Sequence, residues 1–352
     1  MSIMSMLLFM KGISTQSMQK FFPRMMNIEL TTACPLRCPQ CYCSLANGKH
    51  IELQTALHWI QEGGANGVKD VMLSGGETLC YPHIYEVISA ANKWCGYAHI
   101  ALSGFGFTKN IFDKLVNSGV CGIFISLNGS TEEINAQTRD GYYLALSALQ
   151  LLHKYGFQNT YINWVMHSCN SDDFINVVEI AEKYEVRRLV VMALKPDSNN
   201  KVPTMPTEEQ MLDIKRVINN HKGNVQIMVE SCYSPMIALL KNTKLLGNLN
   251  TSAWKGCGAG RYTFSVSVDG MLSPCRHLNY YEEYSSLSYY WNNSKVLQYI
   301  REIEDNKREP CKSCDFSEYC RHCLAINYKA NADLYIGHEA CPLKSCQLKD
   351  VV

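Results

Sequence analysis

The sequence lacks the features that would place this protein in a membrane, in a secretory route or on a nucleic acid. Its 352 residues contain no apolar stretch near the ~20 residues that a spanning helix needs. The Met-rich opening run has neither a basic segment nor a cleavage-like site, so it does not resemble a secretory signal. A formal net charge of +1 argues against a nucleic-acid partner, because such proteins present a basic face. We therefore expect a cytoplasmic protein with neither a membrane nor a nucleic-acid partner.

Cysteine, in contrast, is abundant. The chain has 17 cysteines, and many of them lie at the short spacings typical of metal ligands. Without a secretory signal, such clusters indicate metal binding in a reducing compartment, because disulfide frameworks belong to oxidising ones. The length allows a large core and two domains.

The first cluster consists of Cys34, Cys38 and Cys41, spaced C-x3-C-x2-C directly after the strand-like run 25–30. Three thiolates are one ligand fewer than a [4Fe–4S] cube ordinarily takes, so one iron would stay open to another ligand. A zinc knuckle is one alternative, but it needs four Cys or His ligands and no His follows at a suitable spacing. A redox dithiol is another, although it needs only one cysteine pair.

Two further motifs, each after an apolar run, could hold a ligand. Gly75 and Gly76 have no Cβ and let the backbone approach a ligand closely, and Glu77 offers a carboxylate to a cationic group. Two glycines after a strand more often form only a turn. Their position one strand–helix unit after the cysteines is the reason to consider them as part of a ligand site. Further on, Ser126 lies in a second apolar run and Arg139 follows it.

In this order, the motifs resemble those of the radical S-adenosylmethionine (SAM) enzymes. The resemblance implies that Cys34, Cys38 and Cys41 hold a [4Fe–4S] cluster whose open iron binds the amino and carboxylate groups of SAM. It further implies that Glu77 faces the methionyl ammonium, Ser126 the ribose and Arg139 the carboxylate. The full set of implied SAM contacts is Tyr42, Gly75, Gly76, Glu77, Ser126 and Arg139.

The sequence departs from the family pattern at three positions. Gln40 precedes the third cysteine, where an aromatic residue is usual. Asn128 replaces the usual Asp, and Asp140 separates Arg139 from Gly141. The adenine contact and the role of position 128 therefore stay open.

The C-terminal cysteines resemble the SPASM extension, which carries two auxiliary [4Fe–4S] clusters in peptide- and protein-modifying radical SAM enzymes. One interval, between Cys320 and Cys323, is a residue shorter than usual. The resemblance assigns three cysteines to the inner cluster and four to the outer one: Cys257, Cys275 and Cys323, and Cys311, Cys314, Cys320 and Cys341. A structural zinc site is the alternative for the closely spaced group 311–323.

The inner cluster is thus one ligand short. Its fourth iron is either open or bound by Cys232, Cys346 or His277. An open iron could bind a substrate thiolate and lower its pKa, which would favour a thioether product. Cys232 is also a candidate hydrogen donor if the product is an epimer, with packing or cluster ligation as the alternatives.

The hydrophobic pattern predicts an α/β fold, because short apolar strands alternate with amphipathic helices. The expected strands are 27–31, 70–73, 99–103, 122–127, 161–165 and 188–192, and the expected helices are 54–62, 84–94, 111–118, 142–155 and 173–184. Six such units predict a partial (β/α)6 TIM-type barrel whose ligands gather at the carboxyl ends of the strands.

The expected domains are an N-terminal extension (1–24), the radical SAM barrel (25–230), a linker helix (231–253) and a small cysteine-rich SPASM domain (254–352). The pattern also predicts a helix at 207–219 and one more strand at 225–230. A hairpin is expected at 262–274 with Asp269-Gly270 as its turn.

The resemblance implies reductive cleavage of SAM to methionine and a 5′-deoxyadenosyl radical, with three [4Fe–4S] clusters in all. The radical would abstract hydrogen from a ribosomally made precursor peptide and give a thioether or carbon–carbon crosslink, an epimer or an excision. Formylglycine formation, as in a sulfatase-maturing enzyme, and a non-catalytic electron carrier are the alternatives. Expected partners are an electron donor such as ferredoxin or flavodoxin and, because few residues precede the first strand, a separate leader-peptide-recognition protein.

Overall fold

The computed structural model describes residues 22–43, 48–195, 205–236, 256–314, 317, 320–331, 333–337 and 341. Cys346, most of the expected N-terminal extension and most of the expected linker helix lie outside these residues.

A nine-stranded sheet, ordered β7-β6-β5-β4-β3-β2-β1-β8-β9, forms the centre of the molecule. Its strands are β1 (Met25–Thr31), β2 (Asp70–Gly75), β3 (Tyr97–Leu102), β4 (Val120–Ser126), β5 (Thr160–Met166), β6 (Arg188–Ala193), β7 (Gln226–Val229), β8 (Thr263–Val266) and β9 (Leu272–Ser273). From β1 to β7 each strand pairs in parallel with the next one along the chain.

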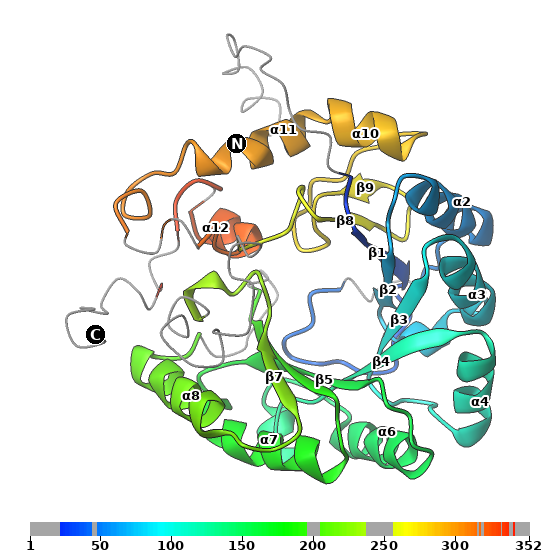
Figure 1. Cartoon of the computed structure of the whole chain (residues 1–352), viewed down its shortest axis with the longest axis vertical. Helices are drawn as coiled ribbons and strands as arrows, with labels where there is room; N and C mark the ends of the chain where they lie inside the picture. The colour runs from blue at the N-terminus through cyan, green and yellow to red at the C-terminus, as the bar shows by residue number, and fades with distance from the viewer. Residues whose placement is uncertain are drawn as a thin grey trace.

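Helices cover the outer face of this curved sheet, and the loop after β1 lies on its inner side (Figure 1). The helices between strands are α2 (Leu53–Ala65), α3 (Ile84–Trp94), α4 (Lys109–Asn117), α5 (Glu132–Ala136), α6 (Tyr142–Lys154), α7 (Phe174–Lys183) and α8 (Glu208–Asn220), with short 3-10 turns η1 (Thr78–Cys80) and η2 (Ser171–Asp173). After β9 come α10 (Leu287–Asn293), α11 (Lys295–Arg301), η5 (Glu302–Glu304) and α12 (Leu324–Asn331).

Burial follows the sequence periodicity that predicted these elements. In β1 alternate residues Met26, Ile28 and Leu30 are fully buried, as expected for side chains that alternate across a strand. In α3 the buried positions are Ile84, Val87, Ile88 and Ala91, the spacing of one helical face. The predicted α/β class with a parallel sheet is therefore confirmed.

The additional strand expected at 225–230 is present as β7, next to β6. What the sequence did not predict is that the C-terminal hairpin extends the same sheet, because β8 pairs in parallel with β1. Parallel pairing between strands more than 200 residues apart leaves no local signal in the sequence. The predicted hairpin itself is confirmed, because β8 and β9 pair antiparallel.

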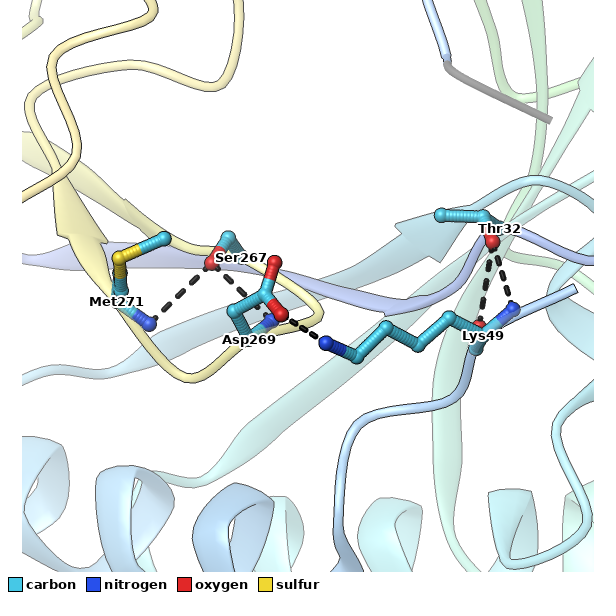
Figure 2. A network of polar contacts seen from close by, with 5 residues as sticks. All are labelled: Thr32, Lys49, Ser267, Asp269 and Met271. Carbon is cyan, nitrogen blue, oxygen red and sulfur yellow. Dashed lines mark hydrogen bonds and ion pairs between the residues drawn. The ribbon is translucent and has the colours of Figure 1, made fainter. Parts of the chain in front are cut away.

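The hairpin turn is fastened to the first strand–helix unit. Trp59 of α2 donates its indole N–H to the Gly270 carbonyl at 3.0 Å. Lys49 pairs through its ammonium with Asp269 in the turn, while its backbone N–H donates to the Thr32 hydroxyl at 2.8 Å (Figure 2). The segment after the cysteine loop is thus tied to the C-terminal part of the chain. In the described portion, no helix is long and apolar enough to cross a bilayer.

Candidate active site

The carboxyl ends of the strands surround a cavity of about 160 Å³. Its lining includes the three cysteines that follow β1, both glycines at the end of β2, Ser126 at the end of β4, and Arg139. The structure thus brings together residues from the three motifs singled out in the sequence. The shared location has a simple cause, because parallel strands end at one edge of their sheet.

Gly75 and Gly76 approach the cysteine loop itself. A Cβ added to Gly76 would lie 2.4 Å from the carbonyl oxygen of Ala33, and one added to Gly75 would lie 2.3 Å from that of Thr31. Backbone hydrogen bonds close this contact, from Gly76 N–H to Thr31 at 2.7 Å and from Glu77 N–H to Ala33 at 2.8 Å. The glycines therefore set the position of the cysteine loop as well as lining the cavity.

Glu77 is buried and is not among the residues that line the cavity. One carboxylate oxygen accepts hydrogen bonds from the Ser103 N–H at 2.9 Å and from the Ser103 hydroxyl, and the other accepts from Leu79 N–H at 3.3 Å. Burial raises the pKa of Glu77, while the bonds from Ser103 oppose this shift. Ser103, which the sequence analysis missed, does line the cavity. Its position directly after β3 is the signal that could have identified it.

The unusual residues Asn128 and Gln40 contact each other. Asn128, which is fully buried, donates its side-chain N–H groups to Gln40 Oε1 at 2.9 Å and to the Thr138 hydroxyl at 2.8 Å. Its Oδ1 accepts from Val165 N–H at 3.0 Å. His167 Nε2 lies 2.5 Å from the same Gln40 oxygen. These contacts join the cysteine loop to the ends of β4 and β5, and an Asp at position 128 could not donate them.

Asp140, the third departure, also holds the cysteine loop. Its Oδ2 accepts from Arg37 N–H at 2.7 Å, and the Arg37 guanidinium donates to the Cys34 carbonyl at 2.7 Å. The neighbouring Arg139 lines the cavity, and its buried Nε has no hydrogen-bond partner among the described residues. A buried cationic donor without a partner suits a carboxylate ligand.

Part of the cavity wall comes from the C-terminal region. Arg276 donates to the Ser74 hydroxyl at 2.8 Å, and its guanidinium lies 5.3 Å from the centre of the Tyr42 ring. The His277 ring meets the same Tyr42 ring edge-on, with centroids 4.4 Å apart. Both Arg276 and His277 line the cavity, and they directly follow the predicted cluster ligand Cys275. The sequence analysis missed Arg276, because this contact joins segments more than 200 residues apart.

Lys195 is a second missed residue. It follows β6, lines the cavity and forms an ion pair with Glu230, which follows β7. The Lys195 side chain is only 8% exposed, so the paired carboxylate is what allows its charge to be buried. Lys195 in turn lowers the pKa of Glu230 against the effect of burial.

Two cysteine thiols of the first cluster, Cys34 and Cys38, have raised pKa values. Burial raises the pKa of Cys34 to about 11. Burial also raises that of Cys38, against the opposing charge of Arg139. Thiols with raised pKa values are protonated at neutral pH, and they lose their protons when they bind iron. Three thiols in one short loop, facing a cavity with an unpartnered arginine donor, fit a site-open iron–sulfur cluster and its SAM ligand.

The C-terminal cysteines form two groups. Cys257, Cys275 and Cys323 are close enough to interact electrostatically, and burial raises the pKa of Cys275 to about 12. Cys320 interacts in the same way with Cys311 and Cys341. Within the described ranges, no three Cys, His, Asp or Glu side chains close around a point that one metal ion could occupy.

The protein thus has an α/β fold with a thiol-lined cavity at the carboxyl ends of its parallel strands. Residues 28–181 match the family model described as the Radical SAM superfamily. This part of the chain is therefore a radical SAM domain.

Two curated relatives extend the match along the chain. The chain is 28% identical over 310 residues to the PqqA peptide cyclase of Ruegeria pomeroyi, and the alignment covers 83% of this chain and 80% of that protein. It is 26% identical over 313 residues to the PqqA peptide cyclase of Bradyrhizobium diazoefficiens, covering 83% and 78%.

Solved structures share the fold. Streptococcus suis SuiB bound to S-adenosylmethionine aligns with a TM-score of 0.72 and 19% identity, over 91% of this chain and 77% of that chain. The enzyme anSMEcpe with bound AdoMet aligns with a TM-score of 0.71 and 16% identity, over 92% and 94%.

Proposed function

We propose that this radical SAM enzyme modifies a ribosomally made precursor peptide. The support from relatives is that two of them are named peptide cyclases and that SuiB has been crystallised with the precursor peptide SuiA. The observation that carries the proposal is the convergence of Cys34, Cys38 and Cys41 with the glycines of β2, Ser126 and Arg139 on one cavity.

In this proposal the three cysteines bind the [4Fe–4S] cluster that supplies the electron for reductive SAM cleavage. Arg139 pairs with the SAM carboxylate through the guanidinium whose Nε has no protein partner. Ser126 faces the ribose, and the backbone at Gly75 and Gly76 meets the methionyl end of SAM. Glu77 acts through Ser103, because its carboxylate accepts two hydrogen bonds from that cavity-lining residue.

The remaining cavity residues orient the ligand and exclude water. The Tyr42 ring contacts both the Arg276 guanidinium and the His277 ring, which fix its position, and it fills space in the cavity that water would otherwise occupy. Lys195 places a buried ammonium on the same cavity, where a peptide carbonyl or carboxylate could pair with it.

The reaction outcome is a finer proposal. The cyclase names of the two relatives favour a crosslink within the peptide over an epimer or an excision. Catalysis then needs an electron donor such as ferredoxin or flavodoxin, and leader-peptide capture by a separate recognition protein is part of the same proposal. A pure electron carrier is disfavoured, because it has no use for a cavity with Ser126 and Arg139 beside the cysteines.

The first prediction tests the catalytic cluster. Replacing Cys34, Cys38 and Cys41 together by Ala should abolish formation of 5′-deoxyadenosine under reduction while iron bound by the C-terminal cysteines remains. The measurement is anaerobic assay of the reconstituted protein with SAM and dithionite, together with iron analysis. Cys121→Ala is the control, because this half-buried cysteine lies in β4 and is not among the cavity residues. Persisting 5′-deoxyadenosine in the triple variant would show that the cluster is elsewhere.

The peptide substrate is tested separately. Coexpression with a small peptide encoded beside this protein, followed by mass spectrometry, should show a mass loss of two hydrogens for a crosslink. The triple cysteine variant should leave the peptide unchanged.

A further inference from the structure

Three segments that lie far apart in the sequence meet beside the end of β7. A Cβ added to Gly256 would lie 2.6 Å from the backbone nitrogen of Arg321 and 2.8 Å from the Ser234 hydroxyl. The Arg321 guanidinium, which is almost fully buried, donates to the Cys257 carbonyl at 2.8 Å. The residues around 232–234, 256–257 and 321–323 are thus packed against one another.

Each of these segments carries a buried cysteine. Cys232 is 9% exposed, and Cys257 and Cys323 are each 6% exposed. The Cys232 and Cys323 thiols lie close enough to form a hydrogen bond with each other, and Cys257 is close enough to Cys323 to interact electrostatically. Cys275 packs against the same core and interacts with both Cys257 and Cys323. Cys323 therefore has three thiols as neighbours, those of Cys232, Cys257 and Cys275, in a place where the family pattern accounts for three cysteines in all.

The other two candidates for the fourth position are weaker. The His277 ring packs edge-on against Tyr42 and lines the SAM-side cavity, and its backbone N–H donates to the Cys275 sulfur at 3.5 Å. Cys346 lies outside the described residues. Cys232 itself is not among the residues that line the cavity, so its position does not support a role as hydrogen donor to a substrate radical there.

We infer that Cys232 is the fourth thiolate of the inner auxiliary cluster, which it completes together with Cys257, Cys275 and Cys323. This inference rests on the proposed function, because the presence of an inner cluster is assumed from the resemblance to peptide-modifying radical SAM enzymes. A [4Fe–4S] cube with four thiolates has no iron left open for a substrate thiolate. The inner cluster then transfers electrons and does not bind the substrate, and thioether formation loses the support that an open iron would give it.

The ligand set has a structural consequence as well. Cys232 follows β7, whereas the other three ligands belong to the C-terminal region. The cluster would therefore join the barrel to the region that contributes Arg276 and His277 to the cavity wall. Loss of Cys232 should disturb the cluster first and SAM binding second.

The experiment compares anaerobically reconstituted full-length wild type with Cys232→Ala, Cys232→Ser and a control. The control is Cys95→Ala, because Cys95 is also buried and its thiol donates to a backbone carbonyl of α2 at 3.5 Å. Cys232→Ala should lose about a third of the bound iron, one cube of three, or convert one cube to a three-iron form visible by electron paramagnetic resonance. Cys232→Ser should keep the iron but shift the resonance of one cluster.

Iron content and spectra in both Cys232 variants equal to those of Cys95→Ala would overturn the inference and leave the proposed function untouched. If the wild type itself formed no 5′-deoxyadenosine from SAM, that result would instead count against the proposed function. If neither Cys232 variant folds by circular dichroism, titration of wild type with free cysteine decides. A four-thiolate cluster should show no spectral change on this titration, whereas a new thiolate-bound spectrum would demonstrate an open iron and refute the ligation by Cys232.

Discussion

Single residues explain why this chain can depart from the family pattern and still build the site. Gln40 and Asn128 are each unusual alone, but the amide of one donates to the amide oxygen of the other at 2.9 Å. Asp140 interrupts the usual Arg-Gly pair, yet its carboxylate accepts from the backbone of Arg37 in the cysteine loop. The departures therefore fasten the loop to its surroundings, and a buried network of this kind depends on every member being satisfied.

At the same scale, Gly76→Ala should displace the cysteine loop. The new methyl group would lie 2.4 Å from a backbone oxygen that cannot move without the loop. We expect at least about tenfold weaker SAM binding, which corresponds to a loss of about 1.4 kcal/mol, and reduced incorporation of the first cluster. The measurement is isothermal titration with SAM under anaerobic conditions.

Gly63→Ala is the matched control for this substitution. Gly63 lies inside α2, where a Cβ would meet the flexible end of Met26 at 3.3 Å, and Ala favours a helix over Gly by up to about 1 kcal/mol. SAM binding should be unchanged. Equal effects of the two substitutions would contradict the assigned role of Gly76.

Among the elements, β1 has the central position because it carries the cysteine loop and is paired on both sides, with β2 and with β8. Its amino end is held by a small charged group at the start of β2. Asp70 pairs with Arg24 at 3.4 Å and with His99 of β3 at 3.6 Å. A substitution that weakens these contacts should therefore destabilise β1, the strand that carries the cysteine loop.

Asp70→Asn should lower the stability of the fold in a pH-dependent way. The hydrogen bond from His99, together with Arg24, lowers the pKa of Asp70 below its ordinary value of 3.8 despite partial burial. Because the folded-state pKa is the lower one, the stabilisation is fully present above about pH 4 and is lost as pH falls through the folded value. The expected loss at pH 7 is about 1 kcal/mol, since the group is partly exposed.

Urea unfolding of the iron-free protein at pH 7 and at pH 3 would measure this difference. The variant and the wild type should differ at the higher pH and converge at the lower one. Asp113→Asn serves as control, because the Lys109–Asp113 pair on α4 is exposed and such pairs contribute little. A gap that persists unchanged at pH 3 would rule out the carboxylate as its cause.

For the whole molecule, the two kinds of cluster should differ in their effect on stability. The cluster of the β1 loop links residues 34–41, whereas the proposed inner cluster links 232 to 323. A link across a long loop removes more entropy from the unfolded chain than a link across a short one. By this argument the inner cluster stabilises the fold by about 2 kcal/mol more than the first one does.

The reconstituted Cys257→Ala/Cys275→Ala variant should therefore melt about 5 °C below the Cys34/Cys38/Cys41 triple Ala variant. Differential scanning calorimetry under anaerobic conditions gives the comparison, with the iron-free wild type as the common baseline. Iron-free forms of the three proteins should melt close together. The opposite order of the reconstituted variants would contradict the long-range link.

The sequence by itself determined the features that are local along the chain. The spacing of Cys34, Cys38 and Cys41, the Gly75-Gly76-Glu77 segment and the alternation of strands with helices are each written in neighbouring residues. Periodicity therefore predicted the parallel α/β fold, and the rule that parallel strands end at one edge predicted that these motifs share a site.

Only the tertiary structure decided how distant segments meet. Four contacts join residues that are far apart in the sequence. They are the pairing of β8 with β1, the contact of Arg276 with the Tyr42 ring, the position of Lys195 in the cavity wall and the contact of Cys232 with Cys323. Such contacts depend on which buried surfaces fit once the elements pack, and packing is a property of the assembled core that no local pattern encodes.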